Sequence, residues 1–170
     1  GAFAQSDAKG APDAKRAPIV KHTESNCKRA RKWTLVYIDA MPENATSFKP
    51  TPEIRSFAEQ MLHLAFWNYA IAESLGRKAN PYGKKQETLE QRDEVKTKVA
   101  LRKVVEESYD NMLAAVAGLD EAKMLEQVSF FNTKMTRMTV LVSALDHQAH
   151  HRGQTTIYLR LKGLTPPPEP

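Results

Sequence analysis

The segment 52–75 limits the possible folds more than any other part of the chain, because it would be apolar on nearly every face of a helix. Its apolar side chains are Phe57, Met61, Leu62, Leu64, Phe66, Trp67, Tyr69 and Ile71. A helix that is apolar all round has to be covered by other elements on all sides. Thr51 can cap the N-terminus of this helix, and Pro52 is favourable at its first position. Gly76 is favourable at its C-terminal end. We therefore predict a helix over residues 52–75 at the centre of the fold.

Three other segments, 24–41, 88–117 and 136–162, carry apolar residues at helical spacing. Prolines and glycines separate the four predicted helices: Pro42, Pro50, Pro81, Gly83, Gly118 and Gly163. Residues 127–135 are ambiguous and fit an extended connector, but no repeated strand pattern competes with the helices. The predicted fold is therefore all-α, a four-helix bundle.

The chain has 170 residues, enough to bury a core without disulfide or metal crosslinks. A metal ion in such a chain is more often functional than structural. The single cysteine, Cys27, excludes an intramolecular disulfide framework and the cysteine-rich zinc modules. No apolar run approaches the roughly 18 residues that span a bilayer, so we expect no membrane span.

The net charge of +5 comes from one end of the chain. Residues 1–34 carry eight Lys/Arg and three Asp/Glu, whereas the remainder carries seventeen of each. A nucleic-acid-binding protein needs its basic residues clustered on a folded surface. We therefore expect no nucleic-acid partner.

The first residues are typical of a processed N-terminus. Residues 2–4, Ala-Phe-Ala, followed by Gln5, fit the small-x-small pattern at the end of a bacterial secretory signal. We predict a signal-peptide remnant and flexible tail over 1–20, a single domain over 21–170, and export from the cytoplasm. The alternative is a chance string in a disordered tail, which would leave the protein in the cytoplasm.

His147 and His151 are the strongest chemical signal in the sequence. They are four residues apart, so their imidazoles lie on one face of the last predicted helix, one turn from each other, and could bind one cation. His150 points away from both and cannot easily share the site. The competing interpretation is that these histidines are solvated polar residues, since two imidazoles fall short of the usual three protein ligands.

His63 is a candidate third ligand. It lies within the apolar segment, where an unpaired imidazole is costly, and its other interpretation is a core histidine satisfied by one hydrogen bond. Three imidazoles with an open position are typical of catalytic zinc, and imidazole also suits nickel and iron. Glu59, one turn earlier, could orient the His63 ring or act as a base, or could form a surface ion pair.

One motif of the sequence is His147 and His151 followed by Arg152-Gly153-Gln154, Tyr158-Leu159-Arg160, Gly163 and the closing prolines, and a second is the stretch 56–64 around His63. Together, the two motifs resemble the DinB/YfiT-like superfamily. The resemblance implies a four-helix bundle, commonly dimeric, with a divalent metal, nickel or zinc, on His63, His147 and His151. It also implies that Gly153 allows close helix packing and that Arg152 and Gln154 support the site.

A second apolar stripe on the last helix also favours a homodimer. It consists of Met138, Leu141, Val142, Leu145 and Ala149, and it needs cover from the bundle or from a second subunit.

The resulting hypothesis is an enzyme acting on a small-molecule substrate. The metal would activate a water, as in a hydrolase, or a thiol, as in an S-transferase, and Glu59, Gln154 or Tyr158 would help to position the substrate. Export would favour water, because low-molecular-weight thiols are abundant inside cells. The alternative is a non-catalytic metal- or ligand-binding bundle with a vestigial site. A proton-sensing histidine cluster and a role in DNA repair fit the sequence less well.

Overall fold

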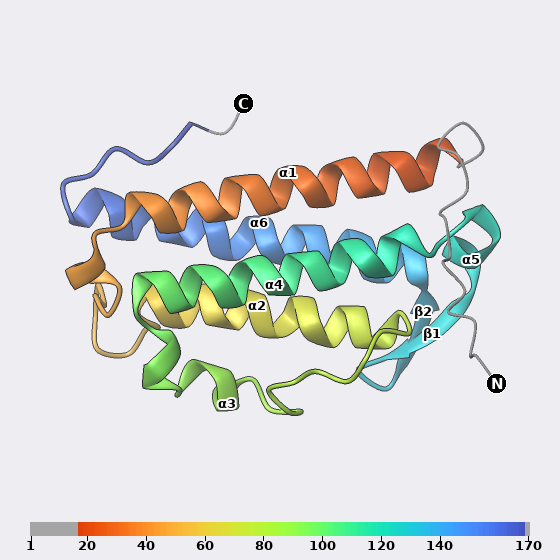
Figure 1. Cartoon of the computed structure of the whole chain (residues 1–170), viewed down its shortest axis with the longest axis horizontal. Helices are drawn as coiled ribbons and strands as arrows, with labels where there is room; N and C mark the ends of the chain where they lie inside the picture. Colours follow the sequence, from red (N-terminus) through yellow and green to blue (C-terminus); the bar gives the residue numbers. More distant parts are fainter. Residues whose placement is uncertain (1–16, 169–170) are drawn as a thin grey trace, which may run out of the picture.

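Four long helices lie side by side in the computed structural model, which describes residues 17–168 (Figure 1). They are α1 (Pro18–Ala40), α2 (Phe57–Ser74), α4 (Lys98–Ala117) and α6 (Arg137–Leu161). Short elements connect them: η2 (Glu43–Ala45), α3 (Glu87–Glu90), η3 (Asp93–Val95), α5 (Glu121–Leu125), β1 (Gln127–Phe130) and β2 (Thr133–Thr136). Helices α1 and α2 each pack against both α4 and α6. This arrangement confirms the predicted four-helix bundle.

Helix α1 begins at Pro18, earlier than the predicted start at residue 24. Proline suits the first turn of a helix, and Val20 is fully buried in the core, so burial favours helix in these residues. The predicted tail over 1–20 is therefore wrong for its last three residues. The predicted signal-peptide remnant at 2–4 lies outside the described residues.

Helix α2 begins at Phe57 and not at Pro52. The Ser56 hydroxyl accepts a hydrogen bond from the Glu59 backbone N–H at 3.2 Å, and the Glu59 carboxylate accepts one from the Ser56 N–H at 2.8 Å. This reciprocal pair satisfies two amide groups at the helix start. The prediction of Thr51 as the N-cap is wrong, because only Ser56 has a glutamate three residues later to complete the pair.

Replacing Ser56 with alanine should destabilise the protein by about 1 kcal/mol, because one N-terminal amide of α2 loses its acceptor. The matched control is Thr51→Ala, in the exposed turn before the helix, which should change stability much less. Urea denaturation measures both. Equal effects of the two substitutions would contradict the assignment of the cap.

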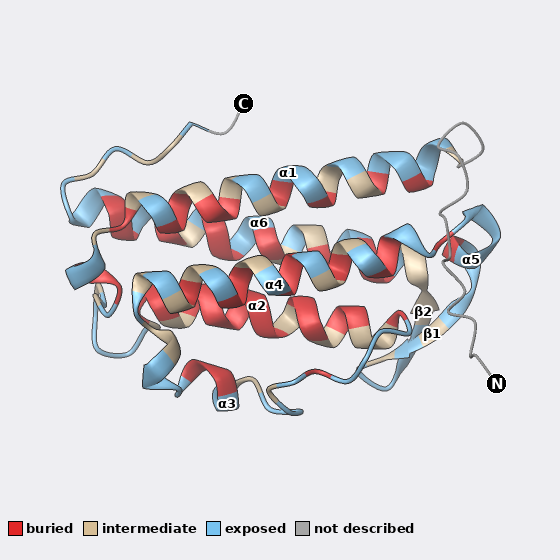
Figure 2. Ribbon diagram, viewed as in Figure 1, coloured by how far each residue is buried: buried red, intermediate tan, exposed pale blue. Residues whose placement is uncertain are grey.

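The predicted central position of α2 is correct. Buried residues follow each other around most of its circumference (Figure 2). The half-buried residues Trp67 and Ala70 lie on the side that the β1–β2 hairpin approaches. Helix α2 therefore carries its functional side chains on a rigid, well-packed element.

The predicted helix over 88–117 is interrupted. Short helix α3 ends at Glu90, and α4 begins only at Lys98, with Thr97 as its N-cap. Leu89 and Glu90 are buried on α2, so this segment has to cross α2 before the chain can enter α4. Helical spacing alone did not reveal this contact.

The ambiguous connector is a paired hairpin. Strands β1 and β2 are antiparallel, with Gln127 opposite Thr136 and Phe130 opposite Thr133. Thr136 then caps α6 by accepting a hydrogen bond from the Thr139 N–H at 3.1 Å. The hairpin therefore leads directly into the helix that carries two of the candidate metal ligands.

The second apolar stripe on α6 is only partly covered. Leu141 is fully packed in the core, whereas Val142 keeps 54% of its surface exposed and Ala149 is also exposed. The homodimer stays a prediction. None of the helices within residues 17–168 combines the length and the hydrophobicity needed to cross a membrane.

Candidate metal centre

The structure brings the three predicted metal ligands together between α2 and α6. His63, His147 and His151 each offer one nitrogen, and these three nitrogens lie within 4.8 Å of one another. The Nε2 atoms of His63 and His147 are 3.3 Å apart. The ring centroid of His151 lies 4.5 Å from that of His63 and 4.3 Å from that of His147. Such a spacing lets one cation contact all three imidazoles.

Glu90 holds the His63 ring from behind. His63 Nδ1 donates a hydrogen bond to Glu90 Oε1 at 2.7 Å, and Arg55 Nε donates to Glu90 Oε2 at 2.7 Å. When Nδ1 carries the only proton of the ring, Nε2 keeps a lone pair that can bind a metal ion. A carboxylate behind a histidine is the usual second partner of a metal-binding imidazole.

Gln60 holds His151 in the same way. His151 Nδ1 donates to Gln60 Oε1 at 2.8 Å, and Gln60 Nε2 donates to Tyr158 Oη at 3.4 Å. Tyr158 in turn donates to the Arg55 carbonyl oxygen at 2.6 Å. Tyr158, a candidate catalytic residue, is thus buried behind His151 and acts on the site through Gln60.

His147 is the most accessible of the three histidines. It is half-buried, and its buried Nδ1 has no hydrogen-bond partner among residues 17–168. Its Nε2 points toward His63 Nε2, although His63 presents only a lone pair there. The lone pairs of His63 Nε2 and His151 Nε2 therefore face the same space, where only the Nε2–H tautomer of His147 could donate to one of them. A divalent cation fits this donor set.

The surroundings of His147 and His151 disfavour protonation of their rings, which leaves the ring nitrogens able to bind a metal ion. Burial, followed by the neighbouring histidines, lowers the pKa of His147 to about 4 and that of His151 to about 3. Burial alone would raise the pKa of Glu90, but hydrogen bonds from His63 and Arg55 outweigh it, and the net pKa is lowered. At neutral pH His147 and His151 are therefore neutral imidazoles, and Glu90 is a charged carboxylate.

The metal-free protein should lose stability as the pH falls from 7.5 to 5. His147 and His151 stay neutral in the folded state down to pKa values of about 4 and 3, whereas in the unfolded state they take up protons near pH 6.5. The unfolded state then binds more protons, so the free energy of unfolding decreases with falling pH. Urea denaturation of chelator-treated protein should show this decrease, and His147→Ala should flatten it. A flat profile for the unsubstituted protein would contradict the prediction.

Glu59 does not orient the His63 ring, because Glu90 occupies that position. Besides capping α2, Glu59 forms ion pairs with Lys49 at 3.1 Å and with Lys96 at 3.5 Å. The ion-pair interpretation of Glu59 is therefore the one that the structure supports.

His150 and Gln154 lie one turn apart at the edge of the centre. His150 is exposed, and its Nε2 is 2.8 Å from Gln154 Nε2, in agreement with its predicted exclusion from the cluster. The buried Oε1 of Gln154 has no partner among the described residues. A supporting role of Gln154 in the site stays a prediction.

The family resemblance also gave roles to Arg152 and Gly153, which lie between His150 and Gln154. Gly153 is exposed, and a Cβ atom there would meet no atom within 4 Å, so the predicted close packing at this glycine is wrong within the chain. Arg152 is buried, and its guanidinium lies 5.3 Å from the Trp33 ring centroid of α1. This contact links α6 to α1.

A cavity of about 340 Å³ opens beside His147. It is lined by Trp67, Ile71, Phe130, Phe131, Ser143 and His147. The sequence did not reveal this cavity, because its walls come from α2, α6 and the ambiguous connector. A pair of adjacent phenylalanines in a connector was the one signal that could have suggested it.

Comparison with known proteins agrees with this architecture. A sequence model described as the DinB family matches residues 19–169. The chain belongs to the DinB family. The resemblance drawn from the two histidine motifs is thereby confirmed.

Solved structures of DinB-like proteins share the fold. A DinB-like protein from Bacillus cereus ATCC 10987 superposes with a TM-score of 0.74 at 17% identity, covering 87% of this chain and 95% of that one. The DinB-like protein YjoA from Bacillus subtilis gives 0.65 at 18% identity, covering 86% and 95%. A conserved protein from Enterococcus faecalis gives 0.64 at 17% identity, covering 85% and 97%. At these identities the likeness establishes the fold alone.

Among curated proteins, the uncharacterized protein YrdA of Bacillus subtilis (strain 168) is 40% identical over 42 residues. This alignment spans 25% of this DinB family chain and 25% of YrdA.

Proposed function

We propose that this DinB family protein is a divalent-metal-dependent enzyme. The observation that supports this most is that His63, His147 and His151 converge. In addition, the Nδ1 atoms of His63 and His151 are hydrogen-bonded to Glu90 and Gln60. A catalytic metal needs three protein ligands of fixed orientation and one position for the reacting group. Zinc and nickel are the ions that we expect the three imidazoles to hold.

A divalent ion on three imidazoles lowers the pKa of a water or a thiol and so supplies a nucleophile near neutral pH. The chain contributes the rest. Glu90 and Gln60 keep the Nε2 atoms of His63 and His151 directed inward, and the free Oε1 of Gln154 can accept a proton donor of the substrate. The aromatic residues beside His147 give that side of the centre an apolar surface.

The choice between water and a thiol depends on where the protein works. The predicted export favours a hydrolase, because small thiols are scarce outside the cytoplasm. Retention in the cytoplasm favours a thiol-dependent S-transferase. The homodimer and the small-molecule substrate remain part of this proposal.

The test is to assay zinc-loaded and nickel-loaded protein in two sets of reactions. One set contains esters, amides and phosphoesters, and the other contains electrophiles with added thiols. We expect activity in one set, a loss of at least 100-fold in His147→Ala, and retention in His150→Ala. Activity that survives unchanged in His147→Ala would contradict the mechanism. Stable metal binding without turnover in either set would favour the non-catalytic bundle.

A further inference from the structure

The cavity beside His147 has an almost entirely apolar wall. Trp67, Ile71, Phe130 and Phe131 supply hydrocarbon surface, and Ser143 and His147 are the polar residues in its lining. A cavity of about 150 Å³ lined by apolar side chains can hold benzene. At about 340 Å³, this cavity is more than twice that size and has room for a group of about two or three rings.

The rings in this wall meet at steep angles. The centroid of Trp67 lies 6.4 Å from that of Phe130, at 77° between the ring planes, and 4.5 Å from that of Phe131, at 50°. Trp67 also contacts the His147 ring edge-on, at 6.0 Å and 69°. Aromatic rings prefer such tilted and edge-to-face packing. The wall therefore extends without a break from the hairpin to a candidate metal ligand.

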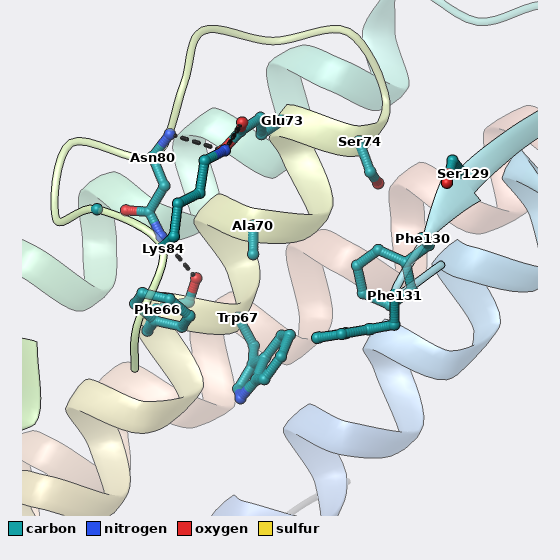
Figure 3. Close-up of a pocket in the computed structure, with 11 residues that line it drawn as sticks. Phe66, Trp67, Ala70, Glu73, Ser74, Asn80, Lys84, Ser129, Phe130 and Phe131 are labelled. Carbon is teal, nitrogen blue, oxygen red and sulfur yellow. Dashed lines mark hydrogen bonds and ion pairs between the residues drawn. The ribbon is translucent and has the colours of Figure 1, made fainter. Parts of the chain in front are cut away.

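Phe131 stands at the hairpin turn in an unfavourable backbone conformation. Its φ is 49° and that of Asn132 is 60°, a pair of left-handed residues for which Asn-Gly is the common choice. A bulky residue with positive φ is rare. Phe131 also keeps 63% of its surface exposed, yet its side chain extends toward Trp67 (Figure 3). The turn thus presents an aromatic ring at a position that small polar residues fit more easily.

Charged groups lie on the other side of the same aromatic residues. A second cavity of about 340 Å³ shares Trp67, Phe130 and Phe131 but contains the ion pair of Glu73 with Lys84 (Figure 3). No Asp, Glu, Lys or Arg side chain lines the cavity beside His147. Away from the histidine cluster, a phosphate or carboxylate would find no cationic side chain there, whereas an apolar ring would be covered on several sides.

We propose that the cavity formed by Trp67, Phe130, Phe131 and His147 binds an aromatic group of the substrate while the reacting group lies at the histidine cluster. This inference rests on the proposed function for the position of the reacting group. It assigns Phe131 as a residue that determines which substrates bind.

The first test measures the cavity without any metal. Chelator-treated full-length protein is titrated with N-phenyl-1-naphthylamine, a neutral probe whose fluorescence rises in apolar surroundings. Phe131→Asn keeps a residue that tolerates positive φ and removes the ring, and it should weaken binding at least tenfold. The control Ile157→Asn alters an exposed apolar residue of α6 that is 59% accessible and outside this cavity, and it should leave the affinity unchanged. Absence of saturable binding, or an affinity in Phe131→Asn within twofold of the unsubstituted protein, would overturn the proposal.

The second test uses ligands that bind the metal ion at the histidine cluster and differ in whether they carry an aromatic group. On zinc-loaded protein, 2-naphthohydroxamate should bind at least tenfold more tightly than acetohydroxamate, and Phe131→Asn should remove that difference. Equal affinities of the two hydroxamates would overturn the placement of the aromatic group. Protein that takes up neither zinc nor nickel would refute the proposed function instead, and the naphthylamine titration would then decide alone whether the cavity accepts an aromatic group.

Discussion

Replacing His63 or His151 with alanine should lower bound metal from about one ion per chain to nearly none. Each substitution leaves two imidazoles, and His63 and His151 are the two ligands whose rings are fixed from behind by Glu90 and Gln60. Loss of a partner behind a metal ligand already costs roughly 10–100-fold in affinity. Loss of the ligand itself should cost more than about 100-fold. Element-specific analysis of untagged protein, purified without chelating resin and refilled with zinc or nickel, measures the effect.

His150 provides the matched control for this experiment. It is the direct neighbour of His151 on α6, but it is exposed and belongs to no group of side chains that could hold a metal among residues 17–168. His150→Ala should therefore keep its metal. An unsubstituted protein that stays metal-free after refilling, or a His63→Ala variant that retains full occupancy, would contradict the assignment.

The histidine pair and the bundle could be predicted from the sequence because both depend on helical periodicity. His147 and His151 are one turn apart on α6 in any straight helix. His63 could be added because an imidazole in an apolar helix needs a partner. The burial of α2 followed from its apolar circumference in the same way.

The partners behind the ligands could not be predicted, because they depend on tertiary packing. Glu90 lies 27 residues from His63 in the sequence, on a short helix that periodicity had merged with α4. Glu59, the acidic residue closest to His63 along the helix, instead closes the capping box with Ser56. The aromatic cavity was hidden for a similar reason, since Phe130 and Phe131 lie in a hairpin whose register only the structure defines.

Glu90 should matter to the metal site nearly as much as a ligand. Its carboxylate fixes the proton on His63 Nδ1, so that Nε2 faces the cluster, and it brings a negative charge close to the bound cation. In Glu90→Ala the His63 ring loses both effects, and Arg55 loses its ion-pair partner. We expect metal affinity to fall about 10–100-fold.

Two further variants separate positioning by Glu90 from a general loss of structure. Glu90→Gln keeps an oxygen that can accept from His63 Nδ1 but removes the charge, so its affinity should lie between those of Glu90→Ala and the unsubstituted protein. Glu87→Gln neutralises an exposed glutamate of the same short helix and should leave metal affinity unchanged. Competition titration with a chromophoric chelator gives the affinities, and urea denaturation reports stability in parallel. If Glu90→Gln binds metal as weakly as Glu90→Ala while remaining as stable as the unsubstituted protein, the carboxylate acts through its charge. If all three variants bind metal equally well, Glu90 does not position His63. The hydrogen bond between His63 Nδ1 and Glu90 then serves only the packing of α3 on α2.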